Sequence, residues 1–246
     1  MPDAFHDVNT LVLLLRKMSH DMRAPLGSAA TTTEMLASGV YGPLDPKQVR
    51  ANERVQRSVL RSIAILEDFM IYLKATTGQL DTTAKPFAPR AVLAQWCDAI
   101  KAHCDEKNLT INVVTQDKLP ENLVTDSAII GKIVLPLLWN AAAFTTEGGV
   151  WIESNWSESP RRWTISVRDS GIGIKPEETP HIYEPFWRGE ERPQVPTACA
   201  GLGLASAQAL AKLLKGDLTL EQSSPKGSTF RVDIPVELPE VAAPSP

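Results

Sequence analysis

The sequence lacks features that mark two common classes of protein. Apolar runs such as Leu11–Leu15 are far shorter than the ~20 residues that a membrane-spanning helix needs, and no signal-peptide cleavage pattern accompanies that run. We therefore expect no direct membrane insertion. A net charge of −4 provides no basic stripe for nucleic acid, so we expect no nucleic-acid partner either.

Cysteine is also scarce, with only Cys97, Cys104 and Cys199 in the chain. These residues form neither a paired framework nor a metal-binding spacing, which favours a reducing, cytoplasmic location. Cys97 and Cys104 lie on one predicted helix, and we expect both to be small core residues. The 43% hydrophobic and 22% charged content is ordinary for a two-domain globular protein of 246 residues.

Two long helices are predicted at the start of the chain. The first runs from about Phe5 to Ala37, and the second begins after Asp45 and continues to about Thr76. Asp45, Pro46 and Gln48 have the order of an N-cap, a first-turn proline and a capping-box partner. The first helix has a predicted buried stripe at Leu11, Leu14, Leu15, Met18, Met22, Leu26, Ala29, Ala30 and Thr33.

Long helices joined by a short turn form an antiparallel hairpin. Each helix of this hairpin has an apolar face that no further local element covers. Pairing with a second copy into a four-helix bundle covers both faces, so we predict a homodimer. The alternative is a hairpin that packs on its own C-terminal domain.

The remainder of the chain predicts a separate α/β domain. The hairpin domain spans residues 1–79, a linker 80–88, the second domain 89–238 and a disordered tail 239–246. In the second domain, helices are predicted at 89–107, from the N-cap Asp126 into the segment Leu137–Thr145, and at 202–215, the last ending at Gly216. Strands are predicted at 109–115, 150–156, 163–168, 218–221 and 228–234. The fold class is α+β: a helical hairpin followed by a two-layer α/β sandwich.

His20 stands beside Asp21 in the first helix, off its apolar stripe. Pro25 has no N–H, so it leaves a helical carbonyl unpaired near the histidine. A lone histidine there is most simply a solvent-facing residue. However, Ser19–Leu26 resembles the H-box of sensor histidine kinases, and four later segments resemble the nucleotide-binding boxes of that family in the expected order.

Two of these boxes carry polar side chains for a nucleotide. Leu137–Thr145 resembles the N-box, and the resemblance implies that Asn140 is a Mg²⁺ ligand. Asp169–Ile174 resembles the G1 box, in which the family uses the carboxylate, here Asp169, to bind the adenine amino group. Gly171 and Gly173 would let the backbone approach the ligand closely.

The other boxes combine glycines with an aromatic segment. Ile182–Gly189 resembles the F-box, and Phe186 is its candidate nucleotide-binding residue. Arg188 or Arg192 could reach phosphate, the alternative being a solvated surface arginine, and 190–200 is a predicted mobile lid. The G2-like segment opens a helix, whose free amides suit phosphate; its residues are Gly201, Leu202, Gly203 and Leu204. Lys226–Phe230 matches the glycine turn that usually follows, and Thr229 is its candidate nucleotide contact.

The resemblance covers about residues 10–236 and implies a GHKL-type, or Bergerat-type, ATP-binding domain with ATP and Mg²⁺ as cofactors. It implies that His20 is the phosphoacceptor and Asp21 the general base. The phosphoryl group would then pass to an aspartate of a separate response-regulator receiver. The input would come from an upstream sensor segment or sensor protein that lies outside this chain.

Four departures from the family pattern leave alternatives open. Cys199 replaces a G2 glycine, Ala143 a phosphate-binding lysine and Pro136 a second asparagine, while Ala24 stands where phosphatase-active members have Thr or Asn. The first three favour a catalytically weak or silent dimeric scaffold. An ATPase of the gyrase, chaperone or mismatch-repair kind would lack the His-Asp hairpin, and a protein-serine kinase of the mitochondrial dehydrogenase-kinase type would not need His20.

Overall fold

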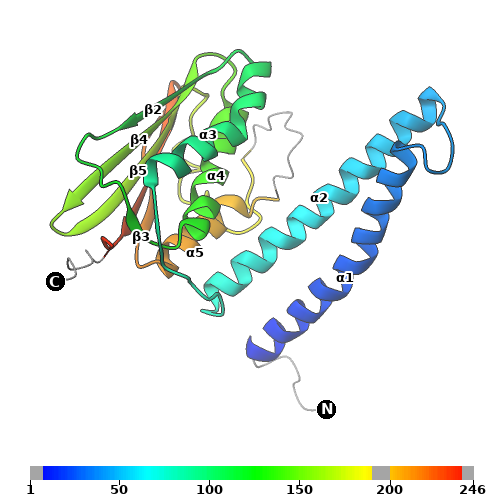
Figure 1. Cartoon of the computed structure of the whole chain (residues 1–246), viewed down its shortest axis with the longest axis horizontal. Coiled ribbons are helices and arrows are strands. Elements are labelled where there is room, and N and C mark those ends of the chain that lie inside the picture. Colours follow the sequence, from blue (N-terminus) through cyan, green and yellow to red (C-terminus); the bar gives the residue numbers. More distant parts are fainter. Residues whose placement is uncertain (1–7, 190–199, 240–246) are drawn as a thin grey trace, which may run out of the picture. The chain divides into compact units, whose positions relative to one another are not determined.

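The computed structural model describes residues 8–189 and 200–239 (Figure 1). The chain divides into two compact units, with the boundary near residue 75. The predicted lid with Arg192 and Cys199, except for Ala200 at its end, lies outside the described residues, as does the tail after Pro239. Each unit is described in turn.

The first unit is the predicted helical hairpin. It consists of α1 (Val8–Ala37) and α2 (Pro46–Thr76), and α1 continues as a helix through Pro25. The capping box at the start of α2 is confirmed. Asp45 Oδ1 accepts from the amides of Lys47 at 2.7 Å and Gln48 at 2.9 Å, while Gln48 Oε1 accepts from the Asp45 amide at 2.9 Å.

Replacing Asp45 by alanine should destabilise the hairpin, because two first-turn amides of α2 lose their acceptor. We expect a loss of about 1 kcal/mol in the free energy of unfolding. Urea denaturation followed by circular dichroism measures it. Asp45→Asn, which keeps a capping oxygen, should lose much less, and equal losses for the two variants would contradict the capping role.

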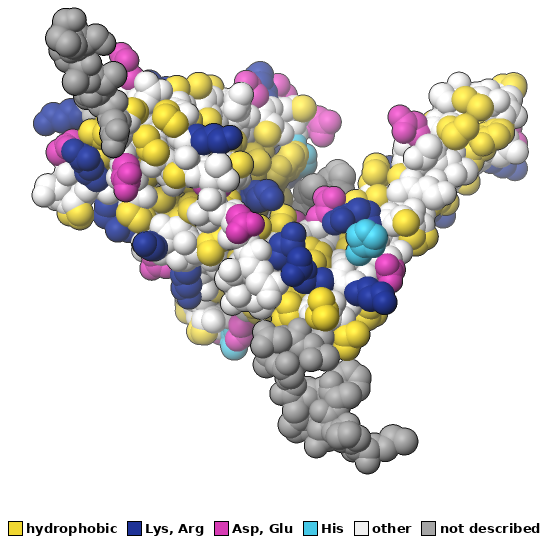
Figure 2. Space-filling model, turned by 60° about the horizontal axis from the view of Figure 1, so that its bottom comes forward, with side chains coloured by type: hydrophobic (Ala, Val, Ile, Leu, Met, Phe, Trp, Pro, Cys, Tyr) yellow, Lys and Arg dark blue, Asp and Glu magenta, His cyan; other side chains and the backbone are white. Residues whose placement is uncertain are grey.

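The predicted α1 stripe is only partly buried in the single chain. The prediction is wrong for Met18, which is 59% exposed, and for Met22, which is 49% exposed, whereas Thr33 of the stripe is buried. Val12 and Ser19, which lie outside the predicted stripe, are also buried. Figure 2 shows hydrophobic side chains on the surface of the helical unit. The hairpin has too little apolar surface of its own to cover both faces of α1, so one face stays open.

A buried amide joins the two helices near their turn. Asn52 of α2 is 8% exposed, and its Nδ2 donates to the Thr33 carbonyl of α1 at 2.8 Å. A buried polar pair of this kind fixes the register of adjacent helices, because any shift leaves both groups unpaired. The turn end of the hairpin is therefore held in one register.

The second unit is the predicted two-layer α/β sandwich. Its main sheet has the order β2-β4-β5-β7-β6, in which β2 and β4 are parallel and the other neighbours antiparallel. Three helices pack on one face of this sheet (Figure 1). The elements are α3 (Pro89–Glu106), β2 (Thr110–Thr115), α4 (Ser127–Phe144), β4 (Gly149–Glu158), β5 (Arg161–Asp169), α5 (Gly203–Leu213), β6 (Asp217–Ser224) and β7 (Gly227–Pro235).

Part of the predicted linker is a strand. β1 (Lys85–Phe87) pairs antiparallel with β3 (Leu123–Thr125), and both strands were absent from the prediction. Strands of three residues are too short to show an alternation of apolar and polar residues, and each depends on a partner distant in sequence. Phe87 also lies against Trp163, with ring centroids 5.7 Å apart, which anchors this segment in the core.

The predicted end of α5 at Gly216 needs correction. The left-handed residue that ends the helix is Lys215, with φ of 58°. Gly216 is needed for a different reason: a Cβ there would lie 2.4 Å from the Asp233 carbonyl oxygen of β7. Gly216 therefore lets the chain pass close to the sheet, and it does not form the helix cap.

Helix α4 is the core helix of this unit, and its predicted stripe is buried; the stripe comprises Ile129, Ile130, Ile133, Val134, Leu137 and Leu138. Among the described residues it alone is long and apolar enough to cross a membrane, but 56% of it is buried within the protein. Cys97 and Cys104 are buried in the core as predicted. Burial raises the pKa of the Cys97 thiol to about 11.

Candidate functional site

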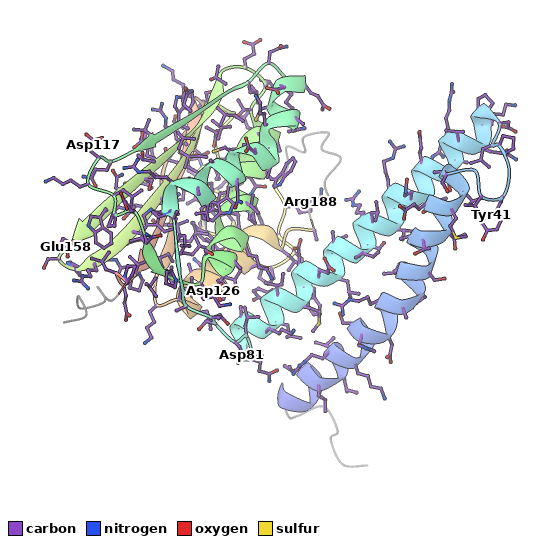
Figure 3. All side chains as sticks on the ribbon, in the orientation of Figure 1. Tyr41, Asp81, Asp117, Asp126, Glu158 and Arg188 are labelled. Atoms are coloured by element: carbon purple, nitrogen blue, oxygen red, sulfur yellow. The ribbon has the colours of Figure 1, made fainter. Side chains whose placement is uncertain are left out.

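The end of α4 and the β5–α5 connection carry the predicted nucleotide residues. Asn140 is half-buried in the last turns of α4. The helix is fixed at its start by Asp126, whose Oδ1 accepts from the Ile129 amide at 3.0 Å and whose Oδ2 accepts from the Thr83 amide at 2.7 Å. Figure 3 shows Asp126 at this point, where the linker meets the helix.

Asp169, the last residue of β5, is held by the backbone around it. Its Oδ1 accepts from the amides of Gly171 at 2.8 Å and Ser228 at 3.3 Å. Burial raises the pKa of this carboxyl, while the two amide hydrogen bonds act in the opposite direction. Because both amides use Oδ1, Oδ2 is the oxygen suited to an exocyclic amine of a ligand.

The glycines of this region serve contacts between protein segments. A Cβ on Gly171 would lie 2.5 Å from the Phe144 carbonyl oxygen, and one on Gly173 would lie 1.9 Å from that of Ser224. Gly227, with φ of 124°, approaches the Asp169 backbone equally closely. Packing of the chain on itself thus requires these glycines, in addition to any approach to a ligand. Thr229 follows in β7, paired with Arg168.

The F-box and G2 segments meet through the backbone. The amide of Phe186, which has a φ of 67°, donates to the Gly201 carbonyl at 2.8 Å. Gly201 has φ of 73°, and a Cβ there would lie 2.4 Å from the Trp187 carbonyl oxygen, so no other residue fits without a shift. Arg188 is exposed (Figure 3).

The G2 segment opens α5 as predicted. Leu202, the N-cap residue, makes no side-chain capping hydrogen bond, so the first amides of α5 lack an acceptor from it. The side chain of Leu202 is fully buried, so only its backbone can reach a ligand. Gly203 and Leu204 are half-buried in the first turn.

The departures at Pro136 and Ala143 are accommodated in a continuous α4. The Pro136 ring faces the start of α5, where a Cβ on Gly203 would lie 3.4 Å from the proline Cβ, an ordinary contact. Ala143 is 4% exposed. The substitutions therefore remove polar groups without breaking the helix that carries Asn140.

In the helical unit, His20 and Asp21 lie together on α1. His20 Nδ1 is 3.4 Å from Asp21 Oδ1, and the two side chains are 82% and 64% exposed. The contact engages Nδ1 and leaves Nε2 outside it. A neutral imidazole with a carboxylate on one nitrogen is oriented for nucleophilic attack through the other.

Sequence reasoning missed two hydroxyls that hold the G1 segment. Ser170 Oγ donates to the Glu147 carbonyl and accepts from the Gly149 amide, both at 2.9 Å. Ser223 Oγ accepts from the Ile174 amide at 2.7 Å. No local pattern marks these serines, because their partners are distant in sequence.

Asn140 is the predicted Mg²⁺ ligand, and the side chains around it decide whether a metal fits there. The described residues contain no group of three or more His, Cys, Asp or Glu side chains placed to hold a metal. An amide oxygen is a suitable hard ligand for Mg²⁺, which keeps several waters and binds phosphate oxygens. Asn140 therefore fits a metal that arrives with a nucleotide, rather than one held by the protein alone.

These features define a class of architecture: a helical hairpin with an exposed histidine, followed by a two-layer α/β domain. Comparison with known families agrees. Residues 10–78 match the His Kinase A (phospho-acceptor) domain, and residues 125–238 match the histidine kinase-, DNA gyrase B- and HSP90-like ATPase domain. The chain belongs to the sensor histidine kinases and has the two domains of their catalytic core.

Individual relatives support this assignment. The autoinducer 2 sensor kinase/phosphatase LuxQ of Vibrio vulnificus is 28% identical over 96% of this chain and 28% of its own length. The sensor histidine kinase AtsR of Burkholderia thailandensis is also 28% identical, over 96% of this chain and 39% of its own length. This chain thus spans less than two fifths of the length of these relatives.

The fold also matches a solved histidine kinase. The crystal structure of full-length ShkA in complex with AMPPNP superposes with a TM-score of 0.80 at 23% identity. The match covers 94% of this chain and 47% of that one. At this identity the likeness shows a shared fold.

Proposed function

We propose that this chain is an ATP-dependent histidine kinase that phosphorylates its own His20 and passes the phosphoryl group to an aspartate of a response-regulator receiver. The observation that carries the proposal is the exposed His20–Asp21 pair in the phospho-acceptor domain of a chain that also has an ATPase-type domain. Autophosphorylation requires both the phosphoacceptor histidine and the ATPase-type domain. Either feature alone would suit a different function.

In the proposed step, the Nε2 lone pair of His20 attacks the γ-phosphorus of ATP. The new N–P bond replaces the bond from phosphorus to the bridging oxygen, and ADP leaves. The ring must then lose its Nδ1 proton, and Asp21 Oδ1 is the acceptor placed beside that nitrogen. Asp21 thus both orients the imidazole and removes its positive charge.

The α/β domain contributes binding and orientation, which dominate phosphoryl transfer. Asp169 would accept from the adenine amino group, and the first amides of α5, at Gly203 and Leu204, would donate to phosphate oxygens. Gly171, Gly173, Phe186, Gly201 and Thr229 complete the proposed contacts. Asn140 would hold Mg²⁺, which neutralises phosphate charge when bound.

We propose that the chain acts as a homodimer in the cytoplasm. The exposed apolar side chains of α1 favour a second copy, because a symmetric partner would bring the same apolar face to cover them. The receiver and an upstream sensor segment or sensor protein are the other proposed partners. LuxQ, a relative, is described as a sensor kinase/phosphatase.

The test is incubation with γ-labelled ATP and Mg²⁺, followed by treatment of the labelled chain with acid or base. A phosphoramidate is lost in acid and kept in base, whereas a serine phosphate survives acid. Label with the first behaviour supports the proposal. Acid-stable label would instead indicate the protein-serine kinase alternative.

The scaffold alternative rests on three departures from the family pattern, Cys199, Pro136 and Ala143. Titration with the ATP analogue AMPPNP separates the two functions. Binding without label uptake from ATP would favour a silent scaffold with a preserved pocket.

Phosphatase activity toward the receiver is expected to be weak, because Ala24 has no group to orient a water. Ala24→Thr should accelerate receiver dephosphorylation severalfold. The measurement is the decay of labelled receiver phosphate on adding unphosphorylated kinase. Ala24→Val, which has the same shape without the hydroxyl, is the control, and rapid decay with the unaltered chain would refute the expectation.

A further inference from the structure

Lys107 lies where α3 ends, and its side chain crosses to the end of α4. The chain reverses just after it, because Asn108 adopts the left-handed conformation with φ of 57°. Lys107 Nζ then donates to three carbonyl oxygens, those of Ala142 at 2.8 Å, Ala143 at 3.0 Å and Thr145 at 3.2 Å. One ammonium thus satisfies three acceptors on a single short segment.

These acceptors are of the kind that a helix end leaves unpaired. The last carbonyls of an α-helix have no amide four residues further on, and Thr145 has already left the helix with ψ of 128°. A cation at this end also interacts favourably with the helix dipole. The half-buried position of Lys107 shields these hydrogen bonds partly from water.

The segment that Lys107 holds also supports the G1 loop. The Ile172 amide donates to the Phe144 carbonyl at 3.4 Å, and Gly171 lies against the same oxygen. Ser170 is bonded to the backbone of Glu147 and Gly149 in the following turn. The end of α4 is therefore the support on which the Asp169 loop rests, and Asn140 lies just before it.

We propose that Lys107 is a positioning residue for the nucleotide site. It holds the end of α4 so that Asn140 and the loop after Asp169 keep their mutual geometry, and it does so from α3, outside every nucleotide-binding box. This role rests on the proposed binding of ATP by this domain. It predicts that loss of the ammonium loosens the G1 loop and weakens nucleotide binding together.

The test compares Lys107→Met, which keeps the length without the donors, with Lys107→Arg, which restores a cationic donor. The full chain is titrated with AMPPNP and Mg²⁺ well below its unfolding temperature. We expect the Kd to rise about tenfold in Lys107→Met and to stay within about threefold of the unaltered chain in Lys107→Arg. Amide exchange of residues 169–174, measured without nucleotide, should accelerate only in Lys107→Met.

Two control variants separate positioning from general stability. Lys101→Met removes an exposed lysine of the same helix, whose Nζ lies 3.4 Å from Asp105. Arg162→Met removes the half-buried ion pair with Asp233 on the sheet and should lower the unfolding temperature without touching α4. Lys107→Gln, whose side-chain amide is shorter and uncharged, replaces Lys107→Met if that variant does not fold.

A Kd for Lys107→Met no higher than that of Arg162→Met, with exchange raised evenly over the domain, would overturn the positioning role. If the unaltered chain fails to bind AMPPNP, the proposed ATP function falls. The exchange experiment then decides the role of Lys107 in holding the loop: acceleration confined to 169–174 supports it, and no such acceleration overturns it.

Discussion

Replacing His20 by glutamine should abolish the uptake of phosphate from γ-labelled ATP. Glutamine keeps the polarity and approximate length of the side chain but has no nucleophilic nitrogen lone pair, so no N–P bond can form. Nucleotide binding should remain unchanged, because His20 lies on the helical hairpin and no nucleotide box includes it. The measurement is the amount of label per chain in the unaltered protein and in His20→Gln. AMPPNP titration of both proteins checks that their nucleotide affinities are equal.

A matched control is available in the same chain. His181 also contacts a carboxylate, with its Nδ1 2.8 Å from Glu184 Oε1. A histidine-carboxylate pair is therefore not rare here, and the reaction must depend on where the pair lies. His181→Gln should keep its label; loss of label in that variant with retention in His20→Gln would reverse the assignment.

Replacing Asp169 by asparagine should weaken nucleotide binding about 100-fold or more, because a site built to accept from a substrate N–H would then present a donor to it. The variant retains an oxygen for the amides of Gly171 and Ser228, so the loop keeps its support. Calorimetric titration with AMPPNP measures the effect. Label uptake should fall in parallel.

The control for this variant is Asp117→Asn, which removes one negative charge in the same way, in the exposed connection between β2 and β3 (Figure 3). Its affinity should match that of the unaltered chain. An unchanged affinity in Asp169→Asn would show that the carboxylate does not recognise the nucleotide. In that case the Asp169 carboxylate would serve only to hold the loop, through its hydrogen bonds to backbone amides.

Local signals predicted much of the fold. The capping box at Asp45 and the apolar stripe of α4 are each set by residues within a few turns, and both are confirmed. The pairing of β1 with β3 was missed, because each strand is stabilised only by the other. Helix α5 was predicted to run to Lys215 but ends at Leu213, and Lys215 rather than Gly216 is the left-handed residue after it. Gly216 misled the prediction because it is needed for contact with β7.

The helical hairpin shows a second limit of the sequence. Met18 and Met22 were predicted to be buried because of their helical spacing, yet both are exposed in the single chain. Periodicity indicates that a face is apolar but not which surface covers it. A covering partner outside the chain, such as the proposed second copy, leaves no trace in the pattern of one helix.

In the candidate site, too, some residues could be predicted from the sequence and others could not. The boxes are short and contiguous, so their order could be recognised from the sequence. The groups that support them are not: Lys107 reaches carbonyls 35 to 38 residues further along the chain. The same holds for Ser170, whose Oγ donates to the Glu147 carbonyl, 23 residues earlier in the chain.

Mapping the phosphorylated atom tests the central claim most directly. After incubation with ATP and Mg²⁺, the chain is digested at alkaline pH, and the labelled peptide is identified by mass spectrometry and by phosphorus NMR. We predict one labelled peptide containing His20, with phosphorus bonded to Nε2. Phosphate on a serine or threonine, or no phosphate on a chain that binds AMPPNP, would contradict the assignment of histidine kinase activity.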